Sequence, residues 1–228
     1  MNAIEENLKE IESRIVNACR EYGRQRENIT LVGISKTKPA ELVREAWRAG
    51  LTNFGENKIQ EAETKIPEVG PGPVWHMVGH LQTNKVKKAV RLFSMIESVD
   101  SLKLAETISS ECVKEDIEMQ VLLEVNSSGE TSKYGFEPDE IEAVAEKISK
   151  LDNLKLEGLM TIGPLTGDTG AIEQAFAMTE KLFGSMRDKF GDTISVLSMG
   201  MSDDFERAIK FGSTELRIGT AIFGARNY

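Results

Sequence analysis

The chain has 228 residues, 40% of them hydrophobic, which is enough to bury a sizeable core within one domain. Its 37 acidic and 28 basic residues give a net charge of −9, which repels a phosphate backbone, so we expect no nucleic-acid partner. No apolar run reaches membrane-spanning length, and glutamates near the N-terminus exclude a signal peptide. These features predict a cytoplasmic protein without membrane association.

An amphipathic helix is predicted at residues 1–23, ending near Gly23. Its apolar residues at helical spacing are Ile4, Leu8, Ile11, Ile15 and Cys19. A membrane-surface or coiled-coil role fits less well, because the polar face is not basic and the apolar stripe is short. We expect the helix to cover the bottom of a barrel.

After this helix, short apolar or β-branched segments alternate with amphipathic segments of helical length. The predicted strands are 30–34, around 53–54, 74–78, 95–98, 120–125, 155–159, 194–197 and 215–218. The predicted helices are 39–49, 57–65, 82–90, 101–115, 138–151, 170–190 and 202–211, and a short turn or helix is expected after the last strand. Eight β-then-α units predict an α/β fold, a (β/α)8 TIM barrel that forms one domain over residues 1–228.

In such a barrel, functional residues follow the strands, and Lys36 follows the first one. A partly desolvated amine loses proton affinity and becomes a nucleophile toward an aldehyde. The alternative is a lysine that extends from the strand end into solvent. Lys38 is expected to point to the same side, as a competing amine.

The loops after the seventh and eighth strands fit a phosphate cradle, the usual phosphate site of this fold. The residues involved are Ser198, Gly200, Ser202, Gly219 and Thr220. The glycines allow close approach of the backbone, and the hydroxyls donate hydrogen bonds. The alternative is an ordinary pair of loops in which Ser202 caps a helix. Asp203 and Asp204 would repel a phosphate unless they point outward.

Arg217 lies on the last strand, where alternation can direct its guanidinium into the barrel mouth. A buried arginine needs a partner, either a ring nitrogen of a ligand or a carboxylate such as Glu215 or Glu124. His76 and His80 are four residues apart, but they flank a strand end rather than one helix face, so no metal site is expected. Cys19 and Cys112 are interpreted as buried apolar residues, because their spacing indicates neither a disulfide nor a zinc site.

Several long motifs together resemble the pyridoxal phosphate (PLP) homeostasis protein family. They are LVGISKTKPAE at 31–41, FGENKIQEA at 54–62, WHMVGHLQTNK at 75–85, GLMTI at 158–162 and SMGMSDDFERAIKFGSTELRIGTAIFG at 198–224. Mild departures are Gly33, where a small apolar residue is commoner, and Leu216, where valine is usual.

The resemblance implies an alanine-racemase-like barrel that holds PLP as a Schiff base on Lys36. It also implies that the phosphate is bound by Ser198, Met201 or Ser202, Gly219 and Thr220, and that Arg217 lies near the pyridine nitrogen. Asn57 and His76 belong to motifs that line the family's pocket. The expected partners are PLP, apo forms of PLP-dependent enzymes and amino acids, and the expected state is a monomer.

The chain is expected to act as a PLP carrier with little or no turnover. The main alternative, an amino-acid racemase, needs two bases on opposite faces of the substrate, and the second comes from an additional domain that the chain has no residues to form. Of Tyr22, Tyr134 and Tyr228, only Tyr134 falls at the correct end of the barrel. A purely structural adaptor would leave Lys36, Gly200 and Gly219 without a shared purpose.

Overall fold

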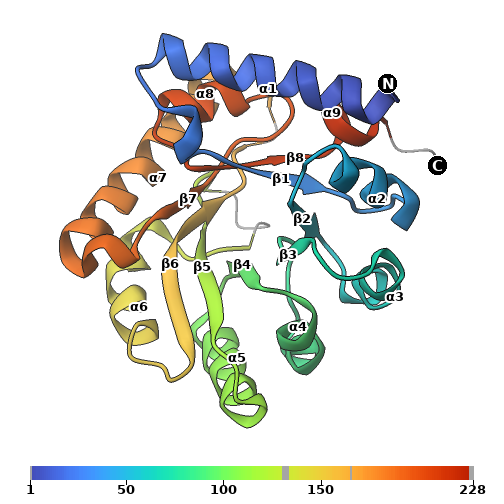
Figure 1. Ribbon diagram of the computed structural model, residues 1–228. Helices are drawn as coiled ribbons and strands as arrows, with labels where there is room; N and C mark the ends of the chain where they lie inside the picture. Colours follow the sequence, from blue (N-terminus) through green and yellow to red (C-terminus); the bar gives the residue numbers. More distant parts are fainter. Residues whose placement is uncertain (1, 130–133, 165, 226–228) are drawn as a thin grey trace.

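The computed structural model describes residues 2–129, 134–164 and 166–225. Eight strands pair in parallel, each with its neighbour in the chain, and the pairing of β1 with β8 closes them into a barrel (Figure 1). The strands are Thr30–Ile34 (β1), Asn53–Glu56 (β2), Val74–Met77 (β3), Met95–Val99 (β4), Met119–Val125 (β5), Leu154–Thr161 (β6), Val196–Ser198 (β7) and Glu215–Ile218 (β8). The predicted (β/α)8 fold is confirmed.

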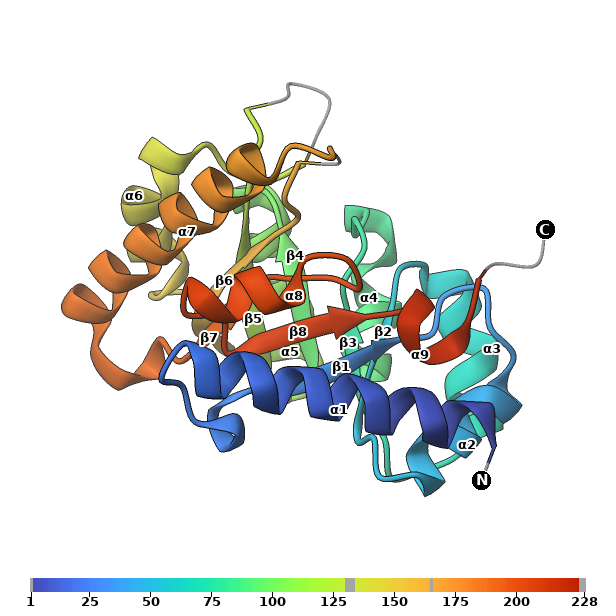
Figure 2. The same cartoon turned by 90° about the horizontal axis from the view of Figure 1, so that it is seen from above.

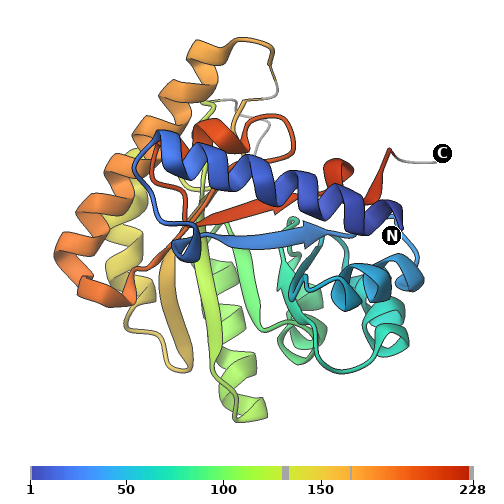
Figure 3. The same ribbon diagram turned by 45° about the horizontal axis from the view of Figure 1, so that its top comes forward.

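Helices surround this barrel on the outside (Figure 3). They are Ala3–Glu21 (α1), Ala40–Arg48 (α2), Ile59–Val69 (α3), Val86–Leu92 (α4), Leu102–Glu115 (α5), Ile141–Ile148 (α6), Thr169–Phe190 (α7), Phe205–Lys210 (α8) and Thr220–Phe223 (α9). Short 3-10 turns lie at Arg26–Asn28, Thr83–Lys85, Pro138–Glu140 and Gly191–Thr193. Over the described ranges, no helix combines the length and apolarity that crossing a bilayer requires.

Most strand residues are buried, as in parallel sheets that are covered on both faces. Every residue of β4 and of β8 is buried. A large core lies between the strands and the helices. A second, small core lies inside the barrel, where Met95, Leu122 and Met160 pack with Ile162 and Val196.

Helix α1 lies along the barrel wall rather than across its bottom, so that part of the prediction is wrong. It runs beside β1 and β8 and packs against α2, α8 and α9 (Figure 2). Asn7 Nδ2 donates to Ile222 O at 2.8 Å, and Arg14 pairs with Glu206 at 2.6 Å. The reason is that α9, with four residues, is too short to cover the last strand. Helix α1 supplies the missing cover.

The loop after β7 differs most from its predicted form. Helix α8 begins at Phe205 rather than at Ser202. The intervening residues form a turn in which the Met201 amide donates to Asp204 Oδ1 at 2.5 Å and the Asp204 amide donates to Met201 O at 3.1 Å. The acidic residues therefore belong to a loop at the barrel mouth and not to the first turn of a helix.

Gly200 begins this loop with a φ of +98°, a conformation that side chains disfavour. A Cβ at this position would lie 2.5 Å from Ala208 Cβ. We expect Gly200→Ala to lower the free energy of unfolding by about 1–3 kcal/mol, through backbone strain and overpacking. Urea unfolding of the purified variant measures this loss.

The matched control is Gly184→Ala, within α7, where a Cβ would meet nothing within 4 Å. It should raise the free energy of unfolding by about 0.5–1 kcal/mol, because alanine favours the helix. Equal effects of the two substitutions would contradict the role given to Gly200.

Candidate functional site

A cavity of about 190 Å³ opens at the end of the barrel where the strands finish. Its lining residues are Ile34, Lys36, Asn57, Val78, Ile162, Met201, Ser202, Asp203, Arg217, Gly219 and Thr220. They come from β1, β8 and the segments that follow β1, β2, β3, β6, β7 and β8. The parallel barrel thus brings seven of the nine predicted site residues into one cavity.

Lys36 reaches this cavity from the turn that follows β1. The strand ends at Ile34, and the chain then turns, with the Lys38 amide donating to Ser35 O at 3.0 Å and Thr37 at a φ of +64°. The turn breaks strand alternation, so the expectation that Lys38 points to the same side is wrong. Lys38 Nζ instead donates to Ala225 O at 2.7 Å, and Lys38 lines a separate surface hollow.

Asn57 lies one residue beyond β2 and lines the cavity opposite the β7 and β8 loops. Its position depends on Gly79, because a Cβ on Gly79 would lie 2.4 Å from Asn57 O and 2.7 Å from Asn57 Cα. The glycine after β3 therefore allows the β2 loop to approach, which brings the Asn57 amide to the mouth of the barrel.

Ser202, Gly219 and Thr220 form the other side of the cavity. The Ala221 amide donates to Ser202 Oγ at 3.4 Å, a contact that joins the β7 loop to the start of α9. Met201 also lines the cavity, but its amide is already bound to Asp204. The predicted cradle thus consists of the Ser202 and Thr220 side chains with the backbone at Gly219.

The two aspartates of the β7 loop have different positions. Asp203 is exposed at the rim of the cavity, whereas Asp204 is buried and turned inward onto the Met201 amide. Burial raises the pKa of Asp204 above its ordinary value. The repulsion considered for a bound phosphate therefore concerns Asp203, which lines the cavity, more than Asp204, whose carboxylate is bound to the Met201 amide.

Arg217 projects from β8 into the barrel and lines the floor of the cavity. Its two terminal nitrogens donate to Ser198 Oγ at 2.6 Å and to Thr161 O at 2.7 Å. Neither Glu215 nor Glu124 is its direct partner, and the nearest carboxylate is Glu97, at 4.0 Å. The guanidinium is therefore held in place by a hydroxyl and a backbone carbonyl.

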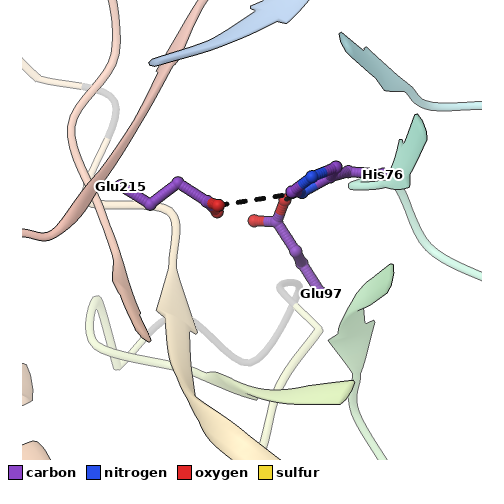
Figure 4. Close-up of side chains that lie close together, drawn as sticks. All are labelled: His76, Glu97 and Glu215. Atoms are coloured by element: carbon purple, nitrogen blue, oxygen red, sulfur yellow. Dashed lines mark hydrogen bonds and ion pairs between the residues drawn. The ribbon is translucent and has the colours of Figure 1, made fainter. Parts of the chain in front are cut away.

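His76 and Ser198, the other two predicted site residues, do not line the cavity. They lie inside the barrel, where Glu97 accepts from Ser198 Oγ at 2.7 Å and shares a hydrogen bond of 2.8 Å with His76 Nδ1. Glu215 lies 3.7 Å from the same histidine nitrogen (Figure 4). Their side chains point inward from the strands at a deeper level than Lys36, and they support Arg217 from below.

The contacts within this buried cluster determine which of its side chains are charged. Burial disfavours the charged form of His76, but its hydrogen bond to Glu97 and the nearby Glu215 outweigh burial and raise its pKa. Glu97 is fully buried, yet His76 and Arg217 lower its pKa. Burial and the charge of Glu97 raise the pKa of Glu215 to about 8. These shifts favour an ionised Glu97 and, at neutral pH, a protonated Glu215, and they favour the charged form of His76.

The same three side chains have ligand atoms within 4.8 Å of one another, close enough to hold a metal ion. The observed contacts favour the hydrogen-bonded cluster, because His76 Nδ1 and Glu97 Oε1 are bound to each other at 2.8 Å. Arg217, in addition, places a positive charge 4.0 Å from Glu97.

Glu97 is the central residue that the sequence analysis missed. It lies within β4, whose other residues include Met95, Ile96 and Val99, and all five positions are buried. A glutamate within an apolar strand of a parallel barrel must point inward or outward into a core, and it needs a polar partner in either case. A glutamate within an otherwise apolar strand was the sequence feature that could have identified Glu97.

Comparison with known proteins connects this geometry to two groups. The model of the alanine racemase N-terminal domain family matches residues 1–227. The pyridoxal phosphate homeostasis protein of Pseudomonas aeruginosa is 43% identical over 229 residues, which cover 100% of this chain and 98% of that protein.

Solved structures agree with these matches. PipY of Synechococcus elongatus, solved with PLP bound, has a TM-score of 0.85 at 32% identity, over 97% of this chain and 100% of that chain. An alanine racemase of Clostridium difficile has a TM-score of 0.78 over 99% of this chain and 57% of that chain. Its identity is 16%, so this last likeness concerns the fold alone.

The raised pKa of Glu215 predicts a pH-dependent stability. Between pH 5 and 8 the unfolded carboxyl is ionised while the folded one keeps its proton, so folding takes up a proton and stability falls as pH rises. We expect Glu215→Gln to reduce this fall by roughly 1–3 kcal/mol, because glutamine stays neutral throughout.

Urea unfolding at pH 5, 6, 7 and 8 measures this slope. The control is Glu10→Gln, an exposed position on α1 that should leave the slope unchanged. An identical slope in the wild type and in Glu215→Gln would show that Glu215 is already ionised in the folded protein.

Proposed function

Because the chain belongs to the pyridoxal phosphate homeostasis proteins, within the alanine racemase N-terminal domain family, we propose that the cavity at Lys36 binds PLP and that the protein carries this cofactor with little turnover. The observation that carries the proposal is the convergence of Lys36, Arg217 and the Ser202–Gly219–Thr220 group on one small cavity.

These residues match the three functional groups of PLP. The Lys36 amine suits the aldehyde, and the hydroxyls of Ser202 and Thr220 with the backbone at Gly219 suit the phosphate dianion. Arg217 suits the pyridine nitrogen, as a donor that keeps its own proton. The PLP bound to PipY, a relative at 32% identity, supports this proposal.

The proposed attachment is a reversible condensation. Lys36 would hold PLP through its amine, which would condense with the aldehyde group with loss of water. Hydrolysis, or exchange with another amine, releases the cofactor again. Reversibility suits a carrier, because it keeps a reactive aldehyde bound until a recipient with higher affinity removes it.

The surroundings of the cavity favour a carrier over a racemase. Of the described lining residues, Lys36 is the one amine, and the other proton-transferring group is the carboxylate of the exposed Asp203. Tyr134 does not line the cavity, since it is 55% exposed and stacks on His80 with 3.7 Å between ring centroids. Tyr22 lies on the outside, just after α1, and Tyr228 falls outside the described residues.

The proposed recipients are apo forms of PLP-dependent enzymes and free amino acids. Both receive the cofactor by the same exchange of one amine for another at the aldehyde carbon. We place this exchange in the cytosol and expect a monomer. Lys38, which lines a neighbouring hollow, is the nearest candidate for an amine that relays the cofactor from Lys36 to a recipient.

Covalent capture by Lys36 gives the central test. Wild-type protein mixed with PLP should be yellow, and borohydride should fix the cofactor's mass on the peptide spanning residues 30–44. Lys36→Ala should lose the visible absorbance and bind PLP about tenfold more weakly or worse, since the covalent bond is gone. Absorbance spectroscopy and peptide mass measure both effects.

Lys38→Ala is the matched control, because it removes the neighbouring amine and leaves the cavity lining intact. It should keep the colour and the label. A colourless wild type, or a label on Lys38, would refute the proposed attachment.

A test of turnover separates the carrier from the racemase. Wild-type protein loaded with PLP should exchange the Cα proton of alanine in deuterium oxide only at a trace rate. Loss of one general base costs about 10²–10⁴-fold in rate. Proton NMR follows the exchange. Rapid exchange that disappears in Tyr134→Phe would favour the racemase.

A further inference from the structure

A buried cluster of charges lies behind the Lys36 turn, outside the cavity. Lys65 projects from α3 and is 5% exposed. Its Nζ donates to Glu56 Oε1 at 2.6 Å, to Glu61 Oε1 at 2.7 Å and to Ser35 O at 2.7 Å. An ammonium has three N–H donors, so these contacts use all of them.

The two glutamates extend the contact to the turn itself. Glu56 is fully buried and accepts from Ser35 Oγ at 2.6 Å. Glu61 accepts from the Thr37 amide at 2.5 Å. The residue before Lys36 is thus held through its carbonyl and its hydroxyl, and the residue after Lys36 is held through its amide.

The cluster is costly to keep, which indicates a purpose other than stability. Burying an ion pair removes hydration that the pair's attraction replaces only in part, and an apolar substitute is often as stable. Thr37, in addition, has a φ of +64°, which costs a residue with a branched side chain free energy. The cluster fixes the backbone conformation of the turn that carries Lys36.

We propose that Lys65, Glu56 and Glu61 are positioning residues that aim the Lys36 amine into the cavity for covalent capture of PLP. The proposal rests on the proposed function. Three anchors fix the backbone on either side of Lys36 from the outer side, and the Lys36 side chain lines the cavity on the inner side. The side chain then starts from one fixed Cα position, which limits the volume that its amine explores.

This arrangement predicts that loss of the anchors affects the binding of two ligands differently. PLP needs the amine, whereas pyridoxine 5′-phosphate has an alcohol in place of the aldehyde and uses the remaining cavity alone. Loss of the anchors should weaken capture of the aldehyde and leave binding of the alcohol nearly unchanged. General damage to the fold would weaken both ligands together.

Glu61→Ala is the variant of choice, because this side chain is 24% exposed and its removal leaves Glu56 paired with Lys65. Stopped-flow absorbance measures the rate of imine formation, and calorimetry measures the affinity for pyridoxine 5′-phosphate. We expect imine formation to slow about tenfold or more, and the affinity for the alcohol to change less than about twofold. Glu61→Gln, which retains an oxygen acceptor for the Thr37 amide, should recover most of the rate.

Glu63→Ala is the matched control, since Glu63 lies on the same helix and pairs with Lys88 at 2.7 Å, away from the turn. It should change neither measurement. A double variant, Lys65→Met with Glu56→Gln, removes the buried charges together and should reproduce the loss of rate.

The possible outcomes distinguish failure of the positioning role from failure of the proposed attachment to Lys36. Unchanged imine formation in Glu61→Ala, or an equal loss of both ligands, would overturn the positioning role. If wild-type protein binds PLP but borohydride labels no peptide containing Lys36, the proposed attachment itself fails, and the comparison of variants is not needed to show it.

Discussion

Closure of the barrel by the pairing of β8 with β1 is the constraint on which the site depends. The register places Val32 beside Arg217 and Gly33 beside Ile218, so the turn after β1 and the start of α9 leave the wall at the same level. Because all strands are parallel, their carboxyl ends lie at one mouth. The pairing of β1 with β8 thus brings Lys36 and Thr220, from opposite ends of the chain, to the same cavity.

Two buried polar clusters then fix the positions of individual side chains at the open end of the barrel. One lies outside the wall, where Lys65 and two glutamates hold the Lys36 turn. The other lies inside, where Glu97 joins His76 and Ser198 beneath Arg217. In both, a buried carboxylate is balanced by a cation and by hydroxyl donors, as the cost of burying charge requires. An amine that follows β1 and a guanidinium from β8, the two strands that close the barrel, are thereby fixed in the lining of one small cavity.

The fold shared with alanine racemase says little about activity by itself, since one fold hosts many functions. The residues at the open end of the barrel bear more directly on activity than the fold does. Lys36, Arg217 and a hydroxyl-bearing cradle provide for binding, whereas Tyr134 is turned toward His80 and solvent. Over the described part of the chain, this lining of binding groups accords with the proposed retention and release of a reactive aldehyde.

From the residues alone we predicted the alternation of strands and helices and the cavity positions of Lys36 and Arg217, because hydrophobic period and position on or after a strand are local properties. Asn57 was predicted from the family resemblance. The placement of Ser198 and His76 below the cavity, and the turn of Lys38 away from it, could not be predicted in this way, because both depend on where a strand stops. The tertiary structure also revealed Glu97 and Lys65, whose partners lie on other elements. Pairing between distant segments leaves no periodic signal along the chain, so side-chain contacts had to be seen in three dimensions.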